Sequence, residues 1–373
     1  MGSPTGVSDE QPLQEFTVID SDVHVEGHIP EIAKMVAERM EMPYSHLLHP
    51  DKGSGSYGFP RSGAHSEIPG KMSVFNFEGF DPVLEPSDID DTLRAELGVD
   101  YPVINMTPMW DVYPDTDQIL QEMPATNDVL LEEFLDSNDD YFGSISIQTR
   151  EPEAAVEEIE RLADERQMVA VLVHPGGQER GLGDSRYDPI WAAAEDNDLA
   201  IAFHTTATGQ MWEMPGIIGS MSTMPELHTL SHPYSMMWVM TSLILEGTPA
   251  KFPDLNFIFL ESGIGWVPYM MSRLNREYST WRSQAPLLEK MPEEYIRDQF
   301  YFGTQPLGEF SKRSHMADII DIVGSGNILF STDFPHFDID NPETIRGFFS
   351  HLSEEEQCGV FGENAIDAFG LPI

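Results

Sequence analysis

The chain has 373 residues, of which 40 % are hydrophobic, and this length is sufficient for one large globular core. Its 64 acidic and 20 basic residues leave a net charge of −44, which disfavours nucleic-acid binding and predicts a salt-adapted, halophilic host, with a basic partner as the alternative. The single cysteine, Cys358, excludes an intrachain disulfide, and the lack of a long apolar run or signal-peptide pattern predicts a soluble, cytoplasmic protein without membrane contact.

Eight short β-rich runs follow a polar N-terminal stretch. Residues 1–15 are polar and contain Gly and Pro, which predicts a disordered tail. The candidate strands after this tail are 17–25, 101–107, 141–148, 168–175, 199–206, 255–262, 301–305 and 327–334. Several of these runs are almost continuously apolar, which is typical of parallel strands buried on both faces.

Helical patterns fill the gaps between these strands, most clearly over 151–166, 187–198 and 266–283. Strands that alternate with helices predict an α/β protein with a single (β/α)8 TIM-barrel domain over residues 16–373. Two long insertions, at about 40–90 and 207–240, show no regular pattern. We expect them to be lids or substrate loops, with plain surface insertions as the alternative.

Polar residues stand at the C-terminal ends of several candidate strands, where TIM barrels carry their catalytic groups. The first strand ends in Asp22-Val23-His24, and period-two alternation points Asp22 and His24 to the same side, toward the barrel axis. His204 ends the fifth strand and Asp333 the eighth. Polar groups on an apolar axis are costly unless they are paired or bind an ion. Two imidazoles and two carboxylates therefore predict a site for one divalent ion, zinc first, with manganese or iron(II) as alternatives.

Further candidates surround this predicted site. His174 follows the fourth strand in an HPGG turn and is either a catalytic or substrate-orienting group or a packed turn residue. Glu261 ends the sixth strand and is a candidate for orienting the substrate. Arg150, at the end of the third strand, is a candidate for binding a substrate carboxylate, with a surface ion pair as the alternative. His232 and Trp212 follow the fifth strand and are candidates for the substrate pocket, with core packing as the alternative for Trp212.

Several segments of the chain resemble a known family. They are VIDSDVHVE (18–26), VHPGG (173–177), FHTTATG (203–209), FPDLNFIFLESGIGWVP (252–268), FGTQP (302–306) and STDFPHFD (331–338). In these segments the chain resembles the amidohydrolase-related family of the amidohydrolase superfamily. The similarity is to the branch that contains aminocarboxymuconate semialdehyde decarboxylase and the resorcylate-type decarboxylases.

The resemblance implies roles for individual residues. The four strand-end residues named above become metal ligands, Asp333 is also the general acid/base, and His336 holds Asp333 in place. The chain departs from the family in having Asp-x-His at the first strand, where relatives have His-x-His or Glu-x-His. It also has Glu261 where the decarboxylases share a His-Gly-Gly sequence, so Glu261 would replace that catalytic histidine as a proton carrier or complete the metal shell.

Two reactions follow from the same predicted site. The first expectation is hydrolysis, in which metal-activated water attacks a small carboxylated or cyclic substrate with Asp333 as general acid/base. The alternative is non-oxidative decarboxylation of a small aromatic or muconate-like acid. A barrel that binds a ligand without catalysis is the alternative from another functional class. A metal-free aldolase or isomerase is disfavoured, because no candidate strand ends in Lys. The resemblance also implies a homodimer.

Overall fold

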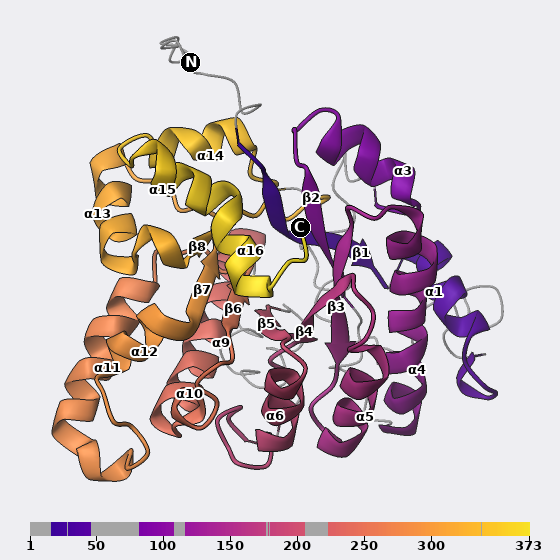
Figure 1. Ribbon diagram of the computed structural model, residues 1–373, viewed down its shortest axis with the longest axis horizontal. Coiled ribbons are helices and arrows are strands. Elements are labelled where there is room, and N and C mark those ends of the chain that lie inside the picture. The colour runs from indigo at the N-terminus through magenta and orange to yellow at the C-terminus, as the bar shows by residue number, and fades with distance from the viewer. Residues whose placement is uncertain are drawn as a thin grey trace.

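The computed structural model describes residues 16–27, 29–45, 82–107, 116–176, 178, 180–205, 223–336 and 338–373, and the predicted tail over residues 1–15 lies outside these ranges. Its core is a parallel sheet of eight strands in sequential order, with helices around it (Figure 1). The strands are β1 (Ile19–Glu26), β2 (Tyr101–Thr107), β3 (Phe142–Ile147), β4 (Met168–Val173), β5 (Ala200–His204), β6 (Phe257–Leu260), β7 (Phe300–Gly303) and β8 (Ile328–Leu329). Each overlaps a predicted strand.

The helices follow the strands along the chain. The α-helices are α1 (Pro30–Glu38), α3 (Pro86–Ile89), α4 (Thr116–Val129), α5 (Pro152–Leu162), α6 (Asp188–Asp196), α9 (Met224–Leu245), α10 (Thr248–Lys251), α11 (Val267–Trp281), α12 (Pro292–Gln299), α13 (Arg313–Val323), α14 (Pro342–Phe349), α15 (Glu354–Cys358) and α16 (Asn364–Phe369). Short 3-10 or π turns are η3 (Asp90–Arg94), η5 (Leu130–Phe134), η6 (Leu135–Ser137), η7 (Arg282–Gln284), η8 (Ser325–Asn327) and η9 (Gly359–Glu363).

Backbone hydrogen bonds close the sheet between its first strand and the segment that follows β8. The Ser21 amide donates to the Phe330 carbonyl at 3.0 Å, and the His24 amide donates to the Phe334 carbonyl at 2.8 Å. The Asp333 amide donates to the Asp22 carbonyl at 3.1 Å. The prediction of a TIM barrel is therefore confirmed, with a seam between β1 and β8.

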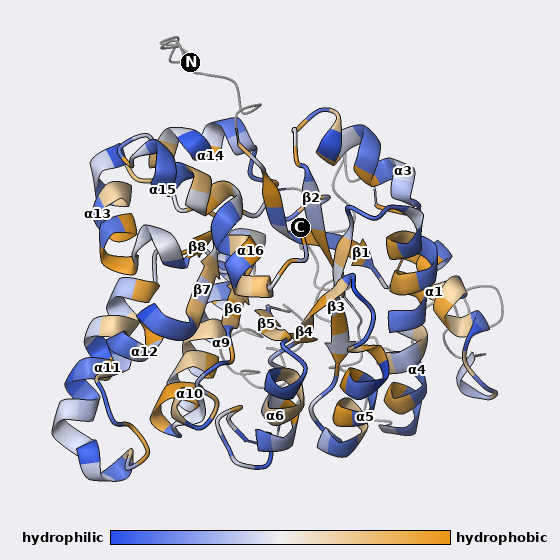
Figure 2. Ribbon diagram, viewed as in Figure 1, coloured by the Kyte–Doolittle hydropathy of each residue, from blue (hydrophilic) through white to orange (hydrophobic). Residues whose placement is uncertain are grey.

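Side chains alternate between the barrel interior and the helix layer. In β5, Ala200 and Ala202 pack in the interior, whereas Ile201 and Phe203 pack against the surrounding helices. Figure 2 shows hydrophobic residues along the central strands and hydrophilic residues on the outer helices. Helix α16 closes one end of the barrel, because its residues Ala368 and Phe369 belong to the same core as the interior strand residues (Figure 1).

The expectation that residues 207–240 lack regular structure is wrong for the C-terminal half of this segment. Residues 224–245 form helix α9, the longest helix in the described part of the chain. A capping box begins it, in which the Glu226 amide donates to Thr223 Oγ1 and the Thr223 amide donates to Glu226 Oε2. Methionine is a good helix former, and Met236 and Met240 are buried one turn apart.

The first predicted insertion, over 40–90, is described only at its ends. Residues 46–81 lie outside the described residues, and helix α3 with its capping box begins at Pro86. In the described ranges, no helix combines the length and hydropathy that crossing a bilayer would require.

Candidate metal centre

Four residues bring their ligand atoms together where β1, β5 and β8 end. Asp22 and His24 lie on β1, His204 ends β5, and Asp333 follows β8. All four side chains are buried, and one ligand atom from each lies within 4.8 Å of the others. His24 Nε2 is 3.2 Å from Asp22 Oδ1 and 2.9 Å from Asp333 Oδ1, and His204 Nε2 is 3.6 Å from Asp22 Oδ2. The structure thus assembles the predicted ligand set across the barrel axis.

Left-handed backbone conformations position two of the carboxylates at this mouth. Ile258 and Leu260 of β6 face the interior, so regular alternation would turn Glu261 outward. Glu261 instead adopts a φ of 48°, and its Oε2 lies 3.4 Å from His204 Nε2. Asp333 has a φ of 64°. Such a conformation costs roughly 1–2 kcal/mol in a residue with a Cβ atom, and it is concentrated at functional sites.

A second layer of polar contacts orients the ligands. Asn105 Nδ2 donates a hydrogen bond to Asp22 Oδ1 at 2.8 Å. His336 Nδ1 lies 2.7 Å from Asp333 Oδ1, and its Nε2 lies 3.1 Å from Glu26 Oε1, as expected of a residue that holds Asp333 in place. The sequence analysis missed Asn105 and Glu26. Alternation could have found both, because Glu26 continues the Asp22-His24 series and Asn105 is a polar residue within a buried strand.

The carboxylates and histidines of the cluster stabilise one another's charged forms. Burial alone would raise the pKa of Asp22, but His24 and His204 outweigh it and lower that pKa. Burial likewise opposes ionisation of Asp333, and His336 and His24 lower its pKa in spite of it. Burial opposes the charged form of His24, but Asp22 raises the pKa of His24 well above its ordinary value. Both carboxylates are therefore ionised at neutral pH, which is the form that binds a metal.

The donor set fits a divalent cation. In the described part of the chain, both ring nitrogens of His24 and His204 are buried without a hydrogen-bond partner, as are Asp22 Oδ2 and Asp333 Oδ2. The short His24 contacts lack hydrogen-bond angles, which is expected of atoms that converge on a common ion. Each such buried polar atom costs about 1–3 kcal/mol when unsatisfied. Two imidazoles and two carboxylates suit zinc, manganese or iron(II), so these residues can hold the predicted metal.

Three further predicted site residues, His174, Glu261 and His232, lie beside this cluster. His174 is buried with its ring centre 5.5 Å from that of His204, and burial, followed by the charge of His204, lowers the pKa of His174 to about 3. Burial, followed by the charge of Asp333, raises the pKa of Glu261 to about 8. His232 Nε2 lies 3.0 Å from Glu261 Oε1. These positions suit contact with a substrate, and the roles themselves stay predictions.

Two residues that the sequence analysis missed extend the site away from the axis. His228 lies one turn before His232 on α9, with ring centres 4.1 Å apart. Its Nε2 lies 3.5 Å from Oδ2 of Asp338, which follows β8. The His-x-x-x-His spacing was the available signal, but it falls in the segment that was expected to be irregular.

Two further substrate-binding candidates follow β3 and β5 along the chain. Arg150 lies in the turn between β3 and α5, where its amide donates to Gln148 Oε1 and its carbonyl accepts from Arg186 Nη2. Trp212 lies outside the described residues. The substrate roles of Arg150 and Trp212 stay predictions.

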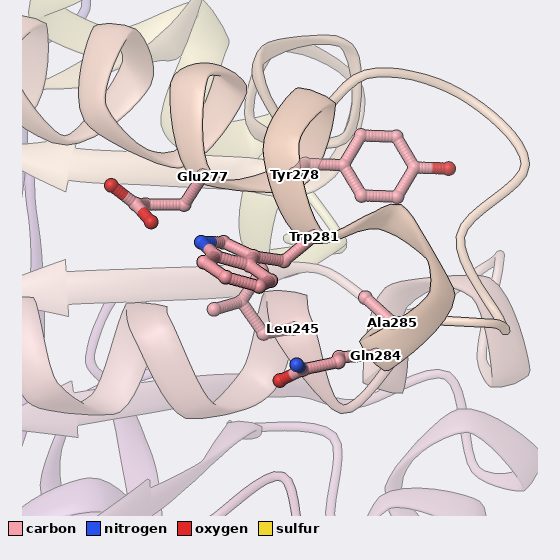
Figure 3. A pocket seen from close by; sticks show the side chains of 6 residues that line it. All are labelled: Leu245, Glu277, Tyr278, Trp281, Gln284 and Ala285. Carbon is pink, nitrogen blue, oxygen red and sulfur yellow. The ribbon is translucent and has the colours of Figure 1, made fainter.

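A separate hollow lies at the C-terminal end of α11. It has a volume of about 400 Å³, and Figure 3 shows its lining residues: Leu245, Glu277, Tyr278, Trp281, Gln284 and Ala285. Its carboxylate, on Glu277, pairs with Arg273 Nη2 at 2.8 Å. None of the four residues of the candidate metal centre lines this hollow.

Comparisons with known proteins agree with this fold. A family model described as Amidohydrolase matches residues 98–371. The gamma-resorcylate decarboxylase of Rhizobium sp. (strain MTP-10005) is 26 % identical over 306 residues, which cover 76 % of this chain and 88 % of that protein. An amidohydrolase structure from Mycobacterium avium subsp. paratuberculosis K-10 has a TM-score of 0.75 at 19 % identity, over 95 % of this chain and 99 % of that one.

A second solved structure adds a bound metal to this comparison. It is a dihydroxybenzoic acid decarboxylase from Polaromonas sp. JS666 with bound manganese and the inhibitor 2-nitroresorcinol. Its TM-score is 0.67 at 18 % identity, over 96 % of this chain and 98 % of that one. The structural matches bear on the fold, whereas the family model covers most of the chain, including His204 and Asp333. The predictions of the family and of an enzyme are therefore confirmed, and the chain belongs to the amidohydrolase family.

Proposed function

We propose that this chain is a metal-dependent decarboxylase of a small aromatic acid that carries a hydroxyl group beside its carboxylate. The observation that carries the proposal is the buried cluster of Asp22, His24, His204 and Asp333, whose ligand atoms lie within 4.8 Å of one another. Curated relatives that act on gamma-resorcylate favour decarboxylation over hydrolysis, our first expectation. Hydrolysis is the second candidate, because Glu261 occupies the place of the histidine that the resembled decarboxylases share.

A divalent ion at this cluster would supply Lewis-acid chemistry to a substrate carboxylate and its neighbouring oxygen. The manganese in the Polaromonas structure supports manganese here, and zinc, our first prediction, suits the same donors. The four ligands come from three strands of a rigid barrel, so they would fix the orientation of the substrate ring in the mouth.

Asp333 is the residue that would relay the proton: its ionised carboxylate would accept a proton from His336, whose Nδ1 lies 2.7 Å from Oδ1, and pass it to the ring carbon. In decarboxylation, the bond between the ring and the carboxyl carbon breaks, carbon dioxide leaves, and the electron pair forms a new bond to a proton at the ring carbon. Asp333 faces the mouth, and His336 and Glu26 behind it hold its carboxylate at one orientation. His174 is buried beside the cluster with no hydrogen-bond partner for either ring nitrogen among the described residues, and it would hydrogen-bond to the substrate hydroxyl.

The test is release of carbon dioxide by the purified protein, loaded with Mn²⁺ or Zn²⁺ in high salt. The substrates are 2,6-dihydroxybenzoate, 5-carboxyvanillate and a set of lactones and amides of similar size. We expect carbon dioxide equal to the acid consumed, and loss of both metal and activity in His204→Ala. Turnover of a lactone or amide without carbon dioxide would transfer the assignment to hydrolysis.

A further inference from the structure

Helix α9 presents a metal-binding pattern that the four-ligand cluster does not use. His228 and His232 stand four residues apart and therefore project from the same face of the helix. Paired histidines at this spacing can bind one ion together, as in helical zinc motifs. One ligand atom from each of them and one from Glu261 all lie within 4.8 Å of one another. These three residues form a second group, next to the first.

Glu261 joins the two groups, because its two oxygens face different histidines. Oε2 lies 3.4 Å from Nε2 of His204, a residue of the four-ligand cluster. Oε1 lies 3.0 Å from Nε2 of His232. A carboxylate that turns one oxygen to each of two sites is arranged as a bridging ligand, and two-metal sites hold their ions about 3.5–4 Å apart.

The remaining contacts prepare the second group for an ion. His232 Nδ1 lies 2.8 Å from Ser231 Oγ, which leaves Nε2 directed at Glu261. Asp338 Oδ2, which accepts from Gln305 Nε2 at 3.1 Å, lies 3.5 Å from His228 Nε2 and adds a fourth donor. The side chains of His228 and Asp338 are 22 % and 24 % exposed, so an ion can enter from solvent here.

Acidic side chains are also concentrated at the mouth. Within the described residues, the ion-pair partners of Asp22, Glu261, Asp333 and Asp338 are all histidines. Carboxylates in a buried site are costly unless a cation or proton compensates them. A second divalent ion would compensate Glu261 and Asp338, whose ion-pair partners include His232 and His228.

We propose that the chain binds a second divalent transition-metal ion through His228, His232, Glu261 and Asp338, with Glu261 bridging it to the ion of the four-ligand cluster. The mouth is then a two-metal centre that spans β1, β5, β6, β8 and helix α9. The proposal concerns binding and holds for either a decarboxylase or a hydrolase.

The test uses the full chain, freed of metal and then titrated with Mn²⁺ in high salt. Elemental analysis and equilibrium dialysis count the bound ions, and electron paramagnetic resonance separates isolated Mn²⁺ from exchange-coupled pairs. We expect two ions per chain with a coupled spectrum in the parent protein. His228→Ala should retain one ion with an isolated spectrum, and E261Q should lose the coupling.

A matched control is His351→Ala, which removes an exposed histidine in the turn after α14 and should retain both ions. One ion per chain at saturation, with the same count in His228→Ala, would overturn the proposal and leave His232 and Glu261 as a hydrogen-bonded pair. Failure of the proposed function is a different result: two coupled ions without carbon dioxide release. Circular dichroism of each variant verifies that it is folded.

Discussion

The two ends of the barrel are built from the same strands but have opposite chemistry. At the N-terminal end, Ala200 of β5 packs with Phe369 of α16 in an apolar core. At the C-terminal end, the same strand finishes in His204, which faces carboxylates of β1 and of the segment after β6. Burying polar groups lowers the free energy of unfolding unless each group is paired. The protein confines this cost to the C-terminal end of the barrel. The comparison teaches that one end supports the fold and the other carries the chemistry.

The largest effect should come from removing the acid at the polar end. In Asp333→Asn, we expect kcat for carbon dioxide release to fall about 10²–10⁴-fold, because the amide cannot deliver the proton. Steady-state kinetics at saturating metal measure this change. The matched control is Asp198→Asn, which makes the same change at a residue that also has a left-handed backbone but lies before β5, at the other end. Equal losses in both variants would contradict the division between the two ends.

The apolar end should respond in stability and not in metal binding. Phe369 is 2 % exposed, and we expect Phe369→Ala to lower the free energy of unfolding by about 3–5 kcal/mol through the cavity that it leaves. Urea unfolding in high salt measures this loss, and elemental analysis of the folded fraction should give unchanged metal content. The control is Phe310→Ala, at a 42 % exposed position, where the change should stay within about 0.5 kcal/mol. Loss of metal in Phe369→Ala would show that the two ends are coupled.

The smallest expected effect is on the pH dependence of stability, and it comes from a buried carboxyl group outside both ends of the barrel. Glu122 on α4 is buried, and burial raises its pKa to about 8, above the ordinary 4.5. The folded state therefore binds the proton more tightly, and the contribution of Glu122 to the free energy of unfolding falls as pH rises from about 4.5 to about 8. Glu122→Gln should remove this dependence, so that the variant gains on the order of 1–3 kcal/mol over the parent above pH 8 and little below pH 4.5.

Urea unfolding of parent and Glu122→Gln across this pH range measures the difference. The exposed Glu160 on α5 provides the control, Glu160→Gln, which should show no such growing gap. A gap that is constant with pH would mean that Glu122 is ionised in the folded protein. The expected result would distinguish two kinds of buried carboxyl group: those at the polar end have histidines beside them, whereas burial keeps Glu122 neutral.

Much of the architecture and the central ligand set could be predicted from sequence, because both depend on local patterns. Apolar runs located all eight strands, and the strand ends identified Asp22, His24, His204 and Asp333. The contacts of Asn105 and Asp338 join segments that are distant along the chain, and no periodicity reports such contacts. The left-handed turn at Glu261 depends on the backbone beyond β6. The single domain, the homodimer and the halophilic host stay predictions.

The seam between β1 and β8 has a consequence for how the enzyme is made. Ser21 Oγ donates to the Phe330 carbonyl across a sequence separation of 309 residues, and the proposed metal ligands lie on both sides of the same seam. A nascent chain that still lacks its last strand would offer an ion only part of this ligand set. Cation loading would therefore depend on completion of the chain, and a bound ion would fasten the first strand to the last. Truncated products could not gain this stabilisation, so metal retention would distinguish finished molecules from unfinished ones.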